Sequence, residues 1–406
     1  MASRDSGISV VVCGSGNISH VLAGLVAGRK STTLAVLVLD REESEEWSKA
    51  AKEGDFTLTA FDADMNLKDT QVKIKVVTGD PARALKKADM ILLSVPVELQ
   101  PSYLEAIAPH VEANMSIVGL PGQLGFELQC YHMLKTKAKK CCFINVNTQP
   151  FAGRIVEYGK SAKILSREES VTISVAKGNS KNGKDPLQVL QYVLGEIPEL
   201  RLYNNFLESA FSDKCIIGPA IMYSKWSKWD GKPVSKKPLF YQELTQDGAK
   251  LISDISDELM LAAKEITKQK PKLELSNAVH IFETLKDEYR YNIEDDSSLL
   301  QAIKTNTAFG KYPHPMDEES EGKFVPDFTH RFLTEDVPYG LVILKGICLL
   351  VKMKTPVLDK VLAWCQEKIG KEYISGSKLD GKDLKETRAP QAYGMKSLDD
   401  LITIIS

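Results

Sequence analysis

Short apolar runs alternate with helical patterns over the first half of the chain. Residues 8–13 (Ile-Ser-Val-Val-Val-Cys) are apolar and β-rich, and a glycine turn and an apolar periodic segment, residues 20–27, follow them. Strands that alternate with helices are typical of a parallel sheet with helices on both faces. The pattern predicts such an α/β domain over residues 1–200, with a helix at 82–88 and further strands at 34–39, 89–95, 116–120, 142–146 and 171–175.

The second half has a different period. After about residue 200 the β-like runs nearly vanish, and apolar residues between Leu251 and Ile266 recur at helical spacing. Residues 338–353 and 356–368 show the same period, whereas the charged stretch 317–323 is expected to form a surface loop. The pattern predicts a mainly α-helical domain over residues 201–406. An α/β domain followed by a helical domain is typical of a dehydrogenase whose substrate lies in the cleft between them.

A glycine turn opens the first predicted helix. Gly14 permits a tight turn, and Gly16 carries no side chain, so a pyrophosphate can approach the backbone. The helix that follows offers free N–H groups and the positive end of its dipole. This order of elements predicts a Rossmann-type dinucleotide site, in which Ser19 takes the third glycine position; a glycine-rich surface turn is the alternative. The predicted contact residues of this turn are Gly14, Ser15, Gly16, Asn17 and Ile18.

An acidic residue ends the second predicted strand. Asp40 can accept hydrogen bonds from ribose hydroxyls and would repel a 2′-phosphate, which favours NAD over NADP. Arg41 follows it and could instead pair with such a phosphate. We therefore expect Asp40 and Arg41 to contact the adenine end of an NAD cofactor.

Three further segments follow predicted strands. In an open parallel sheet the ligand lies beyond the carboxyl ends of the strands. Val95 and Pro96, Gln123, and Asn147 with Thr148 therefore become candidate contacts, although each could belong to an ordinary turn.

Composition excludes several other classes of protein. The 406 residues carry 52 Lys and Arg against 54 Asp and Glu, a net charge of −2, so there is no positive field to gather nucleic acid. No segment is long and apolar enough to span a bilayer, and the start lacks the apolar core of a signal peptide. The seven Cys show no zinc spacing and indicate reduced thiols in a cytoplasmic protein without a metal site.

Several phrases of the sequence resemble the opine dehydrogenases of marine invertebrates, which include the octopine and tauropine dehydrogenases. The phrases cover residues 118–127 (Val-Gly-Leu-Pro-Gly-Gln-Leu-Gly-Phe-Glu), 229–233, 238–242, 326–328, 331–338 and 366–373. The resemblance spans nearly the whole chain. It implies an NADH-dependent reductive condensation of pyruvate with an amino acid, which would reoxidise glycolytic NADH when oxygen is short. A monomer is expected, with a dimer as the alternative.

The resemblance also implies roles for two residues. Arg331 matches the family's arginine, whose planar guanidinium would grip the pyruvate carboxylate. Asp336 matches a carboxylate that orients the catalytic histidine. From the residues alone, Arg331 could simply pair with Glu335 or Asp336, and Asp336 could cap a helix.

The chain departs from the family at position 218. The family's catalytic histidine should precede Pro219, but Gly218 stands there, and losing a general acid or base costs about 10²–10⁴-fold in rate. Asp336, a bound water or His330 could carry the proton instead, or the chain could be an inactive NAD-binding relative or variant. If the proton relay is merely missing, Gly218→His should restore the rate.

Asn147 bears on the choice of amine. An arginine-using relative looks acidic at this place, so a neutral residue favours a small partner such as taurine, alanine, glycine or β-alanine. Gln123 could bind the carboxylate or sulfonate of that partner, and either residue could equally connect loops. A dehydrogenase for a hydroxy acid or sugar phosphate remains the rival enzyme, and it would need no amine.

Overall fold

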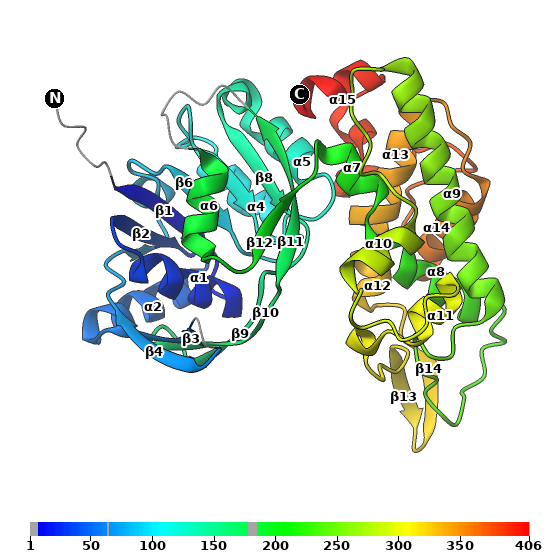
Figure 1. The fold of residues 1–406 in the computed structure, drawn as a ribbon, viewed down its shortest axis with the longest axis horizontal. Helices are drawn as coiled ribbons and strands as arrows, with labels where there is room; N and C mark the ends of the chain where they lie inside the picture. Colours follow the sequence, from blue (N-terminus) through cyan, green and yellow to red (C-terminus); the bar gives the residue numbers. More distant parts are fainter. Residues whose placement is uncertain (1–6, 63–64, 178–184, 406) are drawn as a thin grey trace. The chain divides into compact units, whose positions relative to one another are not determined.

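The computed structural model describes residues 7–62, 65–177 and 185–405, which form two compact units (Figure 1). Residues 1–203 and 404–406 belong to the first unit, and residues 204–403 belong to the second.

An eight-stranded sheet forms the centre of the first unit, in the order β12-β11-β8-β7-β6-β1-β2-β5. The strands from β5 to β8 are parallel, and the strand order reverses at β1, which pairs with β2 on one side and β6 on the other. This confirms the predicted Rossmann-type fold. The parallel order ends at β8, because β11 runs antiparallel to it. The strands are β1 (Ile8–Cys13), β2 (Thr32–Leu37), β5 (Val77–Thr78), β6 (Met90–Leu93), β7 (Ser116–Gly119), β8 (Cys142–Val146), β11 (Ser170–Lys177) and β12 (Glu199–Leu202).

Each central strand contributes to two cores. Along β1, Val10 and Val12 pack on one face of the sheet, and Val11 and Cys13 pack on the other. Burial on both faces explains why these strands are continuous apolar runs. The first face is covered by α1 (Asn17–Gly28), α2 (Arg41–Glu53) and α6 (Pro186–Leu194), and the second by α3 (Pro81–Ala84), α4 (Gln100–Ile107) and α5 (Phe126–Leu134), which leads into a 3₁₀ segment, Lys135–Lys140.

A second sheet, which the sequence pattern did not predict, packs against α1 with residues such as Phe56 and Ala162. Its order is β4-β3-β10-β9, formed by β3 (Phe56–Phe61), β4 (Leu67–Val72), β9 (Phe151–Glu157) and β10 (Ser161–Arg167). In β4 only Val72 is buried, so this strand gives no apolar run to find.

The second unit is mainly helical, as predicted. Its long helix α9 contains the periodic residues from Leu251 to Ile266, and α14 has the bounds of the predicted helix 356–368. The helices are α7 (Phe206–Phe211), α8 (Ile217–Trp226), α9 (Gln246–Gln269), α10 (Ile281–Glu288), α11 (Leu299–Lys304), α12 (Arg331–Thr334), α13 (Val342–Leu350), α14 (Pro356–Lys368) and α15 (Leu398–Ile405), with 3₁₀ segments at Lys214–Ile216, Thr307–Phe309, Leu384–Glu386 and Pro390–Tyr393. The last two residues of α15 are assigned to the first unit.

Two details of the second unit differ from the prediction. The charged stretch 317–323 is not a loop, because β13 (Met316–Ser320) and β14 (Lys323–Pro326) pair there as an antiparallel hairpin. The segment expected as one helix over 338–353 begins with a π-helical turn, Val337–Leu341, before α13. No helix in the described ranges is both long enough and apolar enough to cross a membrane.

Candidate active site

The candidate residues of the first unit lie along one edge of the sheet. Strands β2, β1, β6, β7 and β8 are neighbours in that order and run parallel, so their carboxyl ends meet at the same edge. Residues that follow these strands therefore form a row, which starts at Asp40 and passes through the glycine turn to Val95, Gln123 and Asn147. The predicted contacts of the first unit are thus brought together by the topology of its sheet.

The glycine turn has the shape that a dinucleotide site requires. Gly14 has a φ of +117°, and a Cβ on it would lie 2.7–2.8 Å from atoms of Ser19, Ser94 and Val95. Gly16 is the N-cap residue of α1, and a Cβ on it would meet nothing within 4 Å. The space over Gly16 and the free N–H groups of α1 fit a pyrophosphate.

Ser19 occupies the third glycine position of the turn, and its side chain is used there. The side chain is fully buried, and its hydroxyl donates a hydrogen bond to the carbonyl oxygen of Ser94 at 3.0 Å. This bond ties the first turn of α1 to the end of β6. Ile18 and Ser15 are half-buried beside it, and Asn17 accepts a hydrogen bond from the backbone N–H of Ile155 in β9 at 2.8 Å.

His20 supports the glycine turn from within the core, a role that the sequence did not indicate. The ring is fully buried and stacks on Trp47 with 3.7 Å between the ring centroids. Its Nε2 accepts the backbone N–H of Gly159 at 3.0 Å, so Nδ1 carries the proton and donates to the carbonyl oxygen of Gly16 at 3.1 Å. Burial lowers the pKa of His20 to about 4, and the neutral ring holds Gly16 in position.

The contacts of Asp40 and Arg41, at one end of the row, bear on the choice between NAD and NADP. Asp40 is exposed and caps α2 by accepting the backbone N–H of Glu43 at 2.9 Å. The Arg41 guanidinium extends into solvent and pairs with Glu45 at 2.8 Å. A phosphate at this end would therefore meet carboxylates, which is the arrangement expected for NAD rather than NADP.

Three amides hold the backbone at the end of β7. The side chain of Gln100 donates to the carbonyl oxygen of Pro121 at 3.0 Å, that of Gln149 to Leu120 at 3.1 Å, and that of Asn145 to Gln123 at 2.9 Å. Gln123 is thereby held with a φ of +61°. No sequence pattern marked these three supports.

The amine candidates at the end of β8 are half-buried. The backbone N–H of Asn147 donates to the carbonyl oxygen of Thr172 at 3.0 Å, and its side-chain amide lies 3.4 Å from the Thr172 hydroxyl. Thr148 follows it and keeps partial exposure. Asn147 therefore joins the end of β8 to Thr172 of β11, and part of its surface is still accessible.

The second unit brings together Gly218, Arg331 and Asp336. Gly218 lies in the first turn of α8, and a Cβ on it would be 2.9 Å from Oδ2 of Asp336 and 2.9 Å from the Phe332 ring. Arg331 begins α12 with its side chain 63% exposed, and its Nε lies 3.8 Å from the Glu335 carboxylate. The guanidinium is thus accessible to a carboxylate ligand.

Asp336 lies between two wide backbone turns. Its N–H donates to the carbonyl oxygen of Arg331 at 3.2 Å, and its own carbonyl oxygen accepts from the N–H of Leu341 at 2.9 Å, each five residues away. The side chain makes no capping hydrogen bond at the π-helical turn, so the predicted alternative of a capping role is not what the structure has. Removal of the carboxyl group from water, reinforced by Asp213 and Glu335, raises its pKa well above the usual value, although Arg331 opposes this.

Comparison with known proteins places the whole chain in a family. A family model described as NAD/NADP octopine/nopaline dehydrogenase, alpha-helical domain, matches residues 202–369. The opine dehydrogenase of Haliotis discus hannai is 44% identical over 98% of this chain and 99% of its own, and the tauropine dehydrogenase of Arabella iricolor is 38% identical over 97% and 100%. A solved octopine dehydrogenase with NADH and L-arginine superposes with a TM-score of 0.93 at 38% identity over 98% of both chains.

The chain belongs to the opine dehydrogenase family. It is accordingly an NAD-dependent oxidoreductase, and the open space over Gly16 is compatible with a dinucleotide. The NAD would lie on residues 14–18 and Asp40 and supply the hydride acceptor or donor of the reaction.

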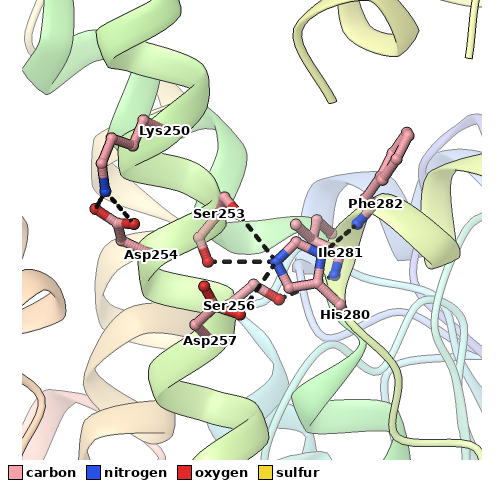
Figure 2. A network of polar contacts seen from close by, with 8 residues as sticks. All are labelled: Lys250, Ser253, Asp254, Ser256, Asp257, His280, Ile281 and Phe282. Atoms are coloured by element: carbon pink, nitrogen blue, oxygen red, sulfur yellow. Dashed lines mark hydrogen bonds and ion pairs between the residues drawn. The ribbon is translucent and has the colours of Figure 1, made fainter. Parts of the chain in front are cut away.

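His280, Ser253 and Asp257 have the residue types of a hydrolytic Ser-His-Asp triad but not its hydrogen bonding. His280 lies beside Ser253 and Asp257 of α9 (Figure 2). Its Nδ1 accepts the N–H of Phe282 at 3.2 Å, so Nε2 carries the proton and faces both the Ser253 hydroxyl, at 3.2 Å, and Asp257, at 3.8 Å. A nitrogen that already holds its proton cannot take one from serine. The cluster caps α10 and joins it to α9.

Within the described part of the chain, no group of three or more His, Cys, Asp or Glu side chains is arranged to hold a metal ion.

Proposed function

We propose that this opine dehydrogenase uses NADH to reduce the condensation product of pyruvate and a small neutral or sulfonic amino acid. The observation that carries the proposal is the accessible Arg331 guanidinium beside Asp336, in a chain related over nearly its full length to opine, tauropine and octopine dehydrogenases. A solved octopine dehydrogenase at 37% identity contains NADH and pyruvate, which supports the keto-acid half of the reaction.

Arg331 would bind the pyruvate carboxylate. A planar guanidinium can form two parallel hydrogen bonds to a carboxylate, and the competing pair with Glu335 is long, at 3.8 Å, and exposed. Because such a pair contributes little, a substrate carboxylate can replace it at small cost. Arg331→Ala should raise the KM for pyruvate strongly and leave the NADH affinity nearly unchanged. Arg331→Lys keeps the charge but loses the planar two-pronged donor, so its KM for pyruvate should lie between those of the wild type and of Arg331→Ala.

Asn147, Thr148 and Gln123 would face the amine partner. They follow β8 and β7 at the carboxyl edge, and none of the three carries a charge that could pair with a guanidinium. An amine whose far end is a methyl group, a hydrogen or a sulfonate fits such a surface better than arginine does. The preferred partners are therefore taurine, alanine, glycine and β-alanine.

A panel of amino acids tests this function. Each is mixed with pyruvate and NADH, and the loss of NADH absorbance is followed; we expect oxidation that depends on an added small amine and is slow with arginine. Asn147→Glu should shift the preference towards arginine. Oxidation by pyruvate without any amine would instead indicate the hydroxy-acid type of dehydrogenase.

One observation favours a second candidate, an NAD-binding relative without turnover. Gly218 supplies no side chain where the family has its histidine. This candidate predicts that NADH binds in calorimetry while no amine of the panel supports oxidation. We propose the active enzyme as the main function, working in the cytoplasm as a monomer, where it would reoxidise glycolytic NADH when oxygen is short.

A further inference from the structure

The space over Gly218 is already filled by two side chains. A Cβ at this position would lie 2.9 Å from Oδ2 of Asp336, 2.9 Å from Cδ1 of Phe332 and 3.1 Å from its Cγ. The Phe332 ring is held there by stacking on Phe240, with 4.5 Å between the centroids. The Asp336 carboxyl group therefore lies directly against the backbone of Gly218, in the place where an imidazole would begin.

Asp336 differs from the other acid of this region. Asp213 is used structurally, because its carboxylate accepts the backbone N–H of Cys215 at 2.7 Å. By contrast, none of the described residues donates a hydrogen bond to the Asp336 carboxyl group, and none forms an ion pair with it. A half-buried carboxyl group without a protein donor is free to exchange its proton with a ligand.

His330, the other candidate for the proton, is engaged elsewhere. Its Nδ1 accepts the backbone N–H of Phe332 at 3.3 Å and so caps α12, and its ring packs edge-on against Phe332 at 4.5 Å. Of the two candidates, only Asp336 has an atom among the three nearest to a Cβ at position 218, its Oδ2 at 2.9 Å.

We propose that Asp336 itself is the catalytic acid and base of this chain, acting directly on the substrate in place of the histidine that position 218 lacks. The proposal rests on the proposed condensation of pyruvate with an amino acid, and it names the residue that moves the proton in that reaction.

The proton balance closes with one carboxyl group. The Asp336 carboxylate takes a proton from the ammonium group of the amino acid, and the freed nitrogen lone pair forms the C–N bond to the keto carbon. The C=O π pair moves to oxygen, which receives a second proton from nitrogen and becomes a hydroxyl. Asp336 then returns its proton to this hydroxyl, the C–O bond breaks, water leaves, and nitrogen forms the C=N bond. The two electrons of the reduction come from NADH, the co-reactant of the proposed function.

The surroundings of Asp336 suit a group that must be both acid and base. A proton carrier works best when its pKa is near the working pH. Desolvation and neighbouring acids raise the pKa of Asp336, and Arg331 limits the rise. The titratable or charged groups that act on it or feel its charge are Asp213, Cys215, Tyr241, Arg331, Glu335 and Cys365.

The test is chemical rescue in the full chain. Asp336→Asn should lower kcat/KM for pyruvate with the best amine by about 10²–10⁴-fold, with NADH binding by fluorescence unchanged. Asp336→Gly should lose activity similarly and regain it on addition of formate, acetate or imidazole, with a rate that follows the pKa of the added acid. A purely structural carboxyl group would show no such dependence. Asp380→Asn, at an exposed loop, is the matched control, and His330→Asn keeps the helix cap while removing the rival imidazole.

The outcomes separate this proposal from the proposed function. If Asp336→Asn keeps the wild-type rate and pH profile while oxidation still depends on the amine, the proton role is overturned and the function stands. Loss of activity in His330→Asn instead would move the role to His330. A wild-type chain that binds NADH and turns over no amine overturns both.

Discussion

Gly14 and Gly16 lie two residues apart in the same turn, yet an added side chain would meet different surroundings. At Gly14 the φ of +117° and contacts of 2.7–2.8 Å make serine costly, by about 1–2 kcal/mol for the backbone and about 1–3 kcal/mol for the crowding. At Gly16 serine is a good helix N-cap in open space.

We therefore expect Gly14→Ser to lower the Tm, and Gly16→Ser to keep it while weakening NADH binding about tenfold or more, which corresponds to about 1.4 kcal/mol. Thermal unfolding without NADH and titration with NADH measure the two effects separately. Equal NADH affinity in Gly16→Ser and the wild type would place the pyrophosphate away from this turn.

Position 218 reverses the usual effect of replacing glycine in a helix. Alanine in place of glycine normally stabilises a helix by about 0.5–1 kcal/mol. Here the methyl group would press on Asp336 and Phe332 at 2.9 Å, and we expect Gly218→Ala to lower the free energy of unfolding by about 1–3 kcal/mol instead. Denaturant unfolding measures it, and Gly54→Ala, where nothing lies within 4 Å, is the control.

The same crowding changes the expectation for Gly218→His. The sequence suggested that an added histidine would restore a missing relay, but its first carbon already collides with the carboxyl group it should pair with. A gain in rate now requires that Phe332 be shortened as well. A large gain from Gly218→His alone would show that Asp336 and Phe332 move aside easily.

Residue types at strand ends could be predicted from the sequence, but their supports could not. Gly14, Gly16 and Asp40 follow apolar runs at recognisable spacing. His20 and Asn145 act through partners far away in the chain, Gly159 at 139 positions and Gln123 at 22, and no local pattern encodes such pairs.

At the scale of elements, burial on both faces decides which strands the sequence reveals. Strands β1 and β8 are buried on both sides, so their apolar runs predicted the observed bounds. Strand β4 and the hairpin strand β13 are mostly exposed and polar, and their pairing is set by tertiary contacts rather than by a pattern.

The cap of α10 gives a prediction at this scale. The ring of His280 accepts the N–H of Phe282, which would otherwise lack a helical partner. His280→Ala should lower the free energy of unfolding by about 0.5–2 kcal/mol, and His280→Asn, a good capping residue, should restore most of it. Denaturant unfolding of both variants measures the difference. If the Ala and Asn variants are equally stable, the contacts with Ser253 and Asp257 matter instead.

At the scale of the whole molecule, each unit contains one buried neutral histidine. Burial lowers the pKa of His20 in the first unit to about 4 and that of His314 in the second to about 3, against 6.5 for the exposed ring. Between pH 6.5 and these values the unfolded chain binds a proton that the folded chain does not, so stability falls as the pH falls.

We expect each histidine to lower the free energy of unfolding by about 2 kcal/mol between pH 7 and pH 5. His20→Gln and His314→Gln should each flatten this dependence relative to the wild type. Thermal unfolding at a series of pH values checks it. An unchanged slope in both buried variants would assign acid sensitivity to other groups.

The order of the two domains could be predicted because the hydrophobic period changes near residue 200, close to the boundary after Tyr203. The antiparallel direction of β11 and the existence of the second sheet could not be predicted, because the direction and pairing of strands depend on which strands meet in space.

The two five-residue backbone turns around Asp336 have a consequence for how this protein can change. An α-helix bonds each N–H four residues back, so each such turn holds one surplus residue. Deleting a single amino acid from 337–341 would let the helix wind regularly. It would rotate the preceding residues, Asp336 included, by about 100° around the helix axis and move the Asp336 carboxyl group away from Gly218. Lineages that lengthen or shorten this segment by one residue should therefore move the Asp336 carboxyl group away from Gly218 in one step.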